Sequence, residues 1–127
     1  MNPEAIIDQN PDVIVKAAWS CGGYDLDTSD TVELEEIREK MMSRLELESV
    51  KAVEEERVYV ISGYILCYGP ASGCRGFLQT AYMAKWFNPD PFEGLDPQAI
   101  HQEYLTKFQG LDINLDTQGV FVYPEPE

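Results

Sequence analysis

Apolar positions along the chain form short unbroken runs and longer helical repeats, which together predict alternating strands and helices. Two compact runs rich in β-branched residues, 12–18 and 57–62, show no alternation with polar positions. Such runs are typical of parallel strands buried on both faces of a sheet. Apolar residues at helical spacing predict helices near 3–7, 31–45, 77–87 and 97–108, and the run 119–123 is a candidate for a short edge strand.

The helix boundaries are marked by capping residues. Asn2 and Asp96 each precede a proline, a pairing typical of an N-cap followed by the first helical turn. Asp30 lies three residues before Glu33, which is an Asp-based analogue of the capping box, and Gly110 is placed to end the last helix. The residues expected on the apolar helix faces are Leu34, Ile37, Met41 and Leu45; Phe77, Leu78, Tyr82 and Trp86; and Ile100, Tyr104, Leu105 and Phe108.

This order of elements predicts the fold class α/β, as a three-layer αβα arrangement on a short parallel sheet. Strands separated by helices normally join through right-handed crossovers, so residues 13–17 and 58–61 should be adjacent parallel strands. The length of 127 residues suits one domain, 1–127, with residues 124–127 as a tail. A sheet with so few strands either lacks its opening strands or is completed by another copy of the chain.

Composition and charge exclude several classes of function. The chain has 23 acidic against 9 basic residues, a formal charge of −14 that repels nucleic acids and anionic lipid surfaces. No run approaches the roughly 20 apolar residues of a membrane span, and the first residues lack the basic and apolar regions of a secretion signal. Cys21, Cys67 and Cys74 form no CxxC pair and are odd in number, which favours free thiols over a disulfide framework.

The candidate binding residues follow the two predicted strands. Ligands of open α/β sheets collect beyond the carboxyl ends of the strands, and both of the following segments combine aromatic residues with glycines. Aromatic rings and an arginine suit a flat, anionic or metal-chelating ligand. The competing explanation is that the aromatic residues pack the loops onto the core and that the arginine forms an exposed ion pair. The candidate ligand-binding residues are Trp19, Tyr24, Tyr64, Tyr68 and Arg75.

Catalytic and metal sites are not predicted. The only histidine, His101, lies in the last helix, far in sequence from both segments, where a surface or helix-face role is favoured over a general base. Cys21 would need that histidine nearby to act as a nucleophile. Cys67 and Cys74 are poorly spaced for zinc, and no Gly-rich phosphate motif, HExxH or GxSxG occurs. We therefore predict no enzyme, no catalytic residue, no metal site and no resident cofactor.

Several motifs along the chain match the motifs of one family of proteins. Pro3-Glu4 with 10–15 resembles its "PE...NPDVI" signature, and 57–61 resembles its "grvyvi" strand. Residues 69–75, preceding a long helix, extend the resemblance along the chain. The segments 84–89, 95–104 and 108–111 complete the set. Together these motifs resemble the solute-binding proteins that deliver iron or cobalamin chelates to ABC transporters, and the last three segments are similar to the archaeal-type iron-complex subgroup.

The resemblance implies the later part of the C-terminal lobe of a two-lobed periplasmic-binding-protein-like fold, whose lobes are joined by a rigid helix. The implied ligand is an iron(III) or cobalamin-type chelate, and the implied partner is an ABC transporter permease bound through the full-length protein. Tyr64 and Arg75 match the family's ligand cleft best. The family acts in extracytoplasmic or cell-surface locations, whereas the chain as written carries no signal peptide and would stay in the cytoplasm.

An alternative function remains open from the sequence. The chain has 14 more acidic than basic residues and few predicted strands. A lobe that has lost transport would persist as an acidic domain that associates with itself or with a partner through its incomplete sheet. We therefore expect either half of a chelate cleft or a homo-oligomer.

Overall fold

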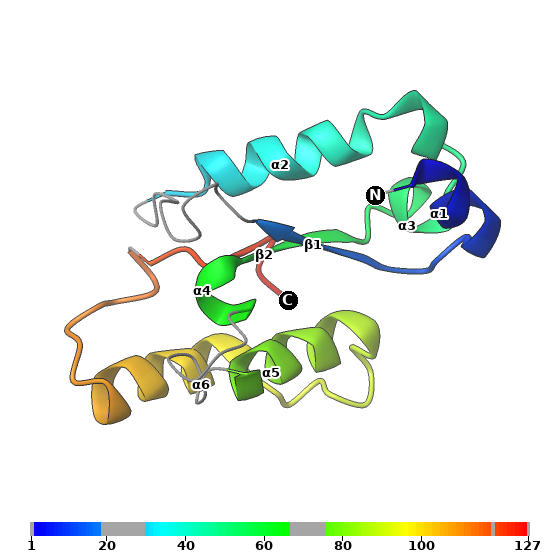
Figure 1. Ribbon diagram of the computed structural model, residues 1–127. Helices are drawn as coiled ribbons and strands as arrows, with labels where there is room; N and C mark the ends of the chain where they lie inside the picture. The colour runs from blue at the N-terminus through cyan, green and yellow to red at the C-terminus, as the bar shows by residue number, and fades with distance from the viewer. Residues whose placement is uncertain (1, 19–29, 67–75, 118, 127) are drawn as a thin grey trace.

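A sheet of three short strands separates helices on its two faces in the computed structural model (Figure 1). The structure describes residues 2–18, 30–66, 76–117 and 119–126, without the side chains of Tyr64 and Leu66. The elements are α1 (Pro3–Gln9), β1 (Ile14–Ala18), α2 (Val32–Met42), the 3-10 turn η1 (Leu45–Leu47), α3 (Lys51–Glu54), β2 (Val58–Ser62), α4 (Gly63–Leu66), α5 (Gly76–Phe87), α6 (Pro97–Glu103), the π-helical turn η2 (Tyr104–Phe108) and β3 (Val122–Tyr123).

The predicted parallel pairing of the two long strands is confirmed. β1 and β2 lie side by side in register from Ile14 opposite Val58 to Ala18 opposite Ser62. β3 joins the other edge of β2 and runs antiparallel to it. The sheet is therefore mixed, and the edge strand expected over 119–123 is reduced to two residues.

Helices cover both faces of the sheet and produce the three layers (Figure 1). On one face α2 buries Leu34 against Val60 and Ala18. On the opposite face α5 and α6 pack over Ile61 and Val122, with Tyr82 in the same cluster. Because consecutive strand residues point to opposite faces, one apolar run supplies both layers. The predicted αβα arrangement is correct.

Most of the predicted capping is present. Asn2 Oδ1 accepts from the backbone N–H of Glu4 at 3.1 Å, and Asp96 Oδ1 accepts from that of Ala99 at 2.8 Å. Gly110 follows the last helix with φ of +66°, a conformation that glycine adopts without steric cost. Asp30 Oδ1 accepts from the N–H of Val32 at 3.0 Å, and the N-cap of α2 is Thr31, one residue later than the sequence predicted.

Several residues predicted on apolar helix faces are exposed instead. Phe77 is 48% exposed, while Leu78, Tyr82 and Trp86 are buried as expected. Phe77 sits in the first turn of α5 and packs edge-to-face on Tyr104 at 5.4 Å between ring centroids, at the rim of the core. Leu45 is 80% and Phe108 73% exposed, because α2 ends at Met42 and the last helix widens into the π-helical turn.

Arg38 joins α2 to the sheet through main-chain contacts. Its Nε donates to the carbonyl of Val58 and its Nη2 to that of Glu56, both at 2.8 Å. A guanidinium suits this role because its donors form a rigid planar fork. The bonds hold α2 at the amino end of β2. None of the helices in the described part of the chain is both long and apolar enough to cross a membrane.

Substitution of Trp86 tests whether α5 packs tightly against the core. Replacing it by alanine is expected to lower the free energy of unfolding by about 3–5 kcal/mol, because a large buried ring is lost and the cavity relaxes only in part. Phe77→Ala on the same helix is the matched control and should cost about 1 kcal/mol, since Phe77 is half exposed. Urea denaturation measures both, and equal losses would contradict the packing described here.

Candidate functional site

The carboxyl ends of β1 and β2 meet at one edge of the sheet, as the sequence predicted for the ligand site. Ala18 and Ser62 are direct partners in the register, and α4 begins at the residue after Ser62. In Figure 1 the ends of β1 and α4 lie at the same end of the molecule. The chain therefore leaves both strands at neighbouring points, where ligands of open α/β sheets bind.

Four of the five predicted ligand-binding residues lie outside the described residues. Trp19 and Tyr24 follow β1, and Tyr68 and Arg75 lie between α4 and α5. Tyr64 is on α4, but its side chain is also outside the description. Their roles stay predictions, supported by the position of the strand ends alone.

The floor of this edge contains a buried hydroxyl group. Ser62 is completely buried, and its Oγ has no hydrogen-bond partner in the described part of the chain. Its backbone N–H donates to the carbonyl of Phe121 at 2.8 Å, which ties the end of β2 to the segment before β3. Leaving a buried hydroxyl unsatisfied costs about 1–3 kcal/mol. Exceptions of this kind call for an explanation beyond packing.

His101 is a core residue rather than the surface or helix-face residue favoured from the sequence. It is 3% exposed, and its Nδ1 lies 3.2 Å from the hydroxyl oxygen of Tyr82. Its ring also packs on Phe121 at 4.9 Å between centroids. Burial, and next the carboxylates of Glu125 and Asp96, raises the pKa of Tyr82 well above its usual range. These contacts place His101 inside the layer formed by α5 and α6.

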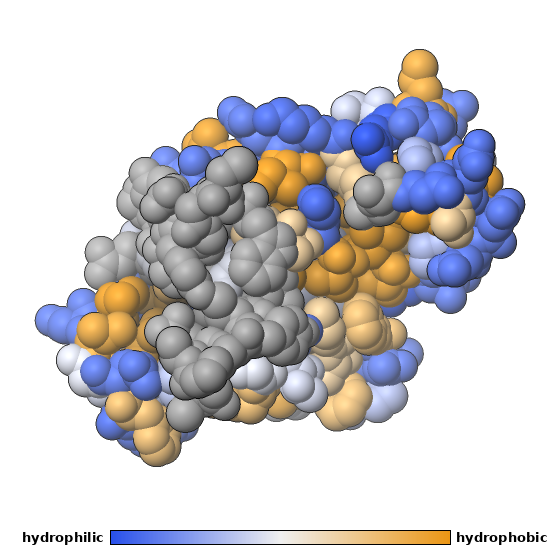
Figure 2. Space-filling model, in the orientation of Figure 1, coloured by the Kyte–Doolittle hydropathy of each residue, from blue (hydrophilic) through white to orange (hydrophobic). Residues whose placement is uncertain are grey.

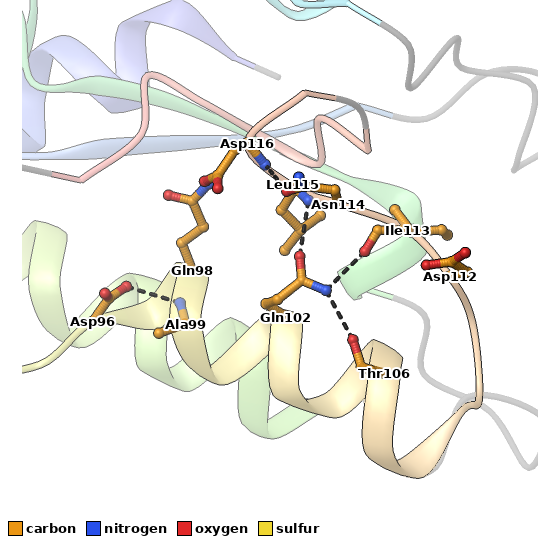
Figure 3. A pocket seen from close by; sticks show the side chains of 10 residues that line it. All are labelled: Asp96, Gln98, Ala99, Gln102, Thr106, Asp112, Ile113, Asn114, Leu115 and Asp116. Carbon is orange, nitrogen blue, oxygen red and sulfur yellow. Dashed lines mark hydrogen bonds between the residues drawn. The ribbon is translucent and has the colours of Figure 1, made fainter.

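A pocket of about 400 Å³ lies between α6 and the segment 112–116 (Figure 3). Gln102 joins its two walls through both ends of its amide. The Nε2 group donates to the carbonyl of Ile113 at 2.7 Å and to Thr106 Oγ1 at 2.9 Å, and Oε1 accepts from the N–H of Leu115 at 2.9 Å. On the same wall Gln98 makes one longer bond, 3.3 Å, to Asp116.

The acidic side of this pocket was missed in the sequence. Asp112, Asn114 and Asp116 alternate along the segment, a spacing that also begins calcium-binding loops. The sixth position of such a loop is glycine and the twelfth glutamate, whereas this chain has Thr117 and Tyr123 there. Among the described residues no group of three or more histidine, cysteine, aspartate or glutamate side chains could hold a metal ion. The pocket is best explained as the joint between α6 and the return to β3.

A second cavity, of about 290 Å³, lies at the opposite end of β2. Arg57, immediately before β2, and Trp86, at the end of α5, line it together with residues of the segment 124–126. The Trp86 ring stacks on Tyr59 at 4.7 Å between centroids. None of the described residues that line it was a predicted binding residue, and the apolar stripe of α5 pointed only to Trp86.

Comparison with known proteins yields no assignment. No protein-family model matches the chain, and no curated protein matches its sequence. The function therefore has to be argued from the geometry and from the residues of this chain.

Gln102 tests whether the pocket of Figure 3 is a structural joint. Gln102→Leu is expected to lower the free energy of unfolding by about 1–3 kcal/mol, because the N–H of Leu115 and the carbonyl of Ile113 lose their partner. It should also speed hydrogen exchange at the Leu115 amide. Gln98→Leu, which removes one exposed bond, is the control and should change neither quantity measurably; similar effects of the two variants would contradict the role of Gln102.

Proposed function

We propose that the chain is a substrate-binding lobe of an ABC importer and contributes half of a cleft for an iron(III) or cobalamin-type chelate. The observation that carries the proposal is the in-register end of the parallel pair, Ala18 beside Ser62. It brings the starts of two aromatic, glycine-containing segments to one edge of the sheet. In open α/β folds this edge is where ligands bind.

The site is a binding site without catalytic groups in this proposal. Trp19, Tyr24, Tyr64 and Tyr68 form apolar walls for the chelate, and Arg75 supplies a charge-assisted hydrogen bond to its anionic groups. A facing lobe would close the other half of the cleft, and a permease would receive the chelate from the closed protein at the extracytoplasmic side of a membrane.

The ligand test is calorimetry with a ferric hydroxamate siderophore and with cobalamin. Binding by a single lobe should be weak, and Arg75→Ala should weaken it by about 1.5–3 kcal/mol, the scale of a hydrogen bond to a charged group. Arg75→Lys should restore only part of the loss, because lysine lacks the planar fork. Arg44→Ala, at an exposed arginine beyond α2, is the charge-matched control. An affinity that Arg44→Ala and Arg75→Ala reduce equally would rule out Arg75 as a ligand contact.

The open edge of the sheet favours a second candidate function, self-association. β1 has a strand neighbour on one side only in the described chain. Figure 2 shows apolar surface between α2 and α5, over β1. A groove of about 390 Å³ runs along this edge, with Ile37 and Met41 beside three cationic side chains, Lys16, Lys40 and Arg44. Lys40 and Arg44 already pair with Glu36 and Glu46 of the same chain. Two copies of charge −14 repel each other, so the apolar open edge would drive the association, and salt should strengthen it by screening that repulsion.

Substitution of Ala17 tests whether the open edge of β1 mediates association, without disturbing the pairing of β1 with β2. The N–H of Ile14 donates to Arg57 O, so the alternation along a strand turns the N–H of Ala17 toward the open edge. Ala17→Pro removes that donor and should shift a dimer to monomer in sedimentation equilibrium, whereas Ala17→Ser should leave the association unchanged. A wild-type chain that sediments as a monomer at high concentration would refute this second function.

A further inference from the structure

The last described segment of the chain, 124–126, packs at the amino end of β2. Its three residues line the cavity of about 290 Å³ there, together with Tyr59 and Trp86. The two rings stack with 14° between their planes, and Trp86 is 3% exposed. In Figure 1 the C-terminus lies between the sheet and α5. The segment 124–126 therefore packs beside an aromatic pair and leaves part of the space unfilled.

The backbone gives this segment little anchorage. β3, which precedes it, has two residues. The N–H of Ser62 donates to the carbonyl of Phe121 at 2.8 Å, and antiparallel pairs alternate in hydrogen bonding, so Tyr123 opposite Val60 is the next bonded pair. Beyond Tyr123, two of the three residues are prolines and have no N–H to donate. Side-chain packing and charge therefore decide whether the segment 124–126 stays in place.

Glu125 faces acidic groups from three other parts of the chain. Glu56, just before β2, lines the same cavity. Asp96, the N-cap of α6, lies close enough to act on Glu125 through its charge. From α5 the phenol of Tyr82 is also near, and the charge of Glu125 contributes to the raised pKa of that phenol. An ionised Glu125 therefore adds to negative charge that is already present.

The two cationic side chains at the cavity bind main-chain carbonyls. Arg57 Nη2 donates to the carbonyl of Trp86 at 3.0 Å, and Lys85 Nζ donates to that of Glu93 at 3.1 Å. Within the described ranges neither cation forms an ion pair with Glu125. The ionised carboxylate thus has no close counter-charge in this part of the structure.

The pKa of Glu125 reflects these surroundings. Burial of its carboxyl group, and next the charge of Asp96, raises the pKa from 4.5 to about 7. A paired cation would lower it instead. Glu125 as a whole residue is exposed, so water screens part of the effect and the consequence for packing is smaller than the full shift.

We propose that the segment 124–126 is a pH-sensitive strap, which stays packed beside Tyr59 and Trp86 while Glu125 holds its proton and loosens when Glu125 ionises. In the released segment the carboxyl group regains its ordinary pKa of 4.5, so both states are protonated below that pH and packing of the strap is strongest there. As the pH rises toward about 7 the released state ionises first and packing is progressively lost. The strap lies at the other end of β2 from the proposed chelate edge and does not depend on it.

Hydrogen exchange at the Tyr123 amide of the full chain tests the proposal, because this is the last strand amide before the strap. After correction for intrinsic exchange, its protection factor should fall about tenfold between about pH 5 and pH 8. The Ala52 amide, which donates to the carbonyl of Pro11 at 3.0 Å far from the strap, is the internal control and should stay constant. In ¹³C spectra the carboxyl signal of Glu125 should titrate near pH 7.

Two matched variants separate the strap from general effects of pH. Glu125→Gln, a neutral isostere of the protonated acid, should keep the Tyr123 protection factor at its low-pH value throughout. Glu103→Gln removes an exposed carboxylate on α6 whose pair with Lys107 is also exposed, and should behave as the wild type. A protection factor that does not change with pH in the wild type, an equal fall in Glu125→Gln, or titration of Glu125 near its ordinary pKa would each overturn the proposal.

Discussion

The parallel pairing of β1 with β2 is the interaction on which the rest of the structure depends. Its register sends Ile14 and Ala18 toward α2, and Val15 and Ala17 toward the opposite layer. A shift of the strand register by one residue would turn each strand's side chains to the opposite face of the sheet and expose the apolar clusters on both sides. The same register places the ends of the two strands together, so core packing and the position of the candidate chelate edge have one physical origin.

Basic residues in this acidic chain bind main-chain carbonyls rather than carboxylates at the points where segments join. Arg38 binds the start of β2 to α2, Arg57 binds the end of α5, and Lys85 binds the turn after α5. The described ion pairs, such as that of Lys40 with Glu36, are exposed and contribute little. Carbonyls at helix and strand ends need donors, so these three cations stabilise the fold where secondary structure leaves acceptors free.

The two ends of β2 differ in what they offer a ligand. At the carboxyl end Ser62 carries a buried hydroxyl beneath the segments expected to hold a chelate. At the amino end Arg57 and Trp86 line a cavity together with residues of the segment 124–126. The first site rests on strand order, whereas the second depends on contacts between segments far apart in the sequence.

The sequence by itself determined the elements whose signal is local. The β-branched runs predicted both long strands and their parallel pairing, and the cap-then-proline pairs at Asn2 and Asp96 marked two helix starts, because capping and burial patterns act over a few residues. Tertiary structure decided the antiparallel return of β3, the exposure of Phe77 and the burial of His101. These features depend on which layer of the folded molecule each residue packs against, and a sequence pattern does not specify that layer. The cavity beside Trp86 has the same origin: Arg57, Trp86 and Glu125 become neighbours only when β2, α5 and the C-terminal segment pack together.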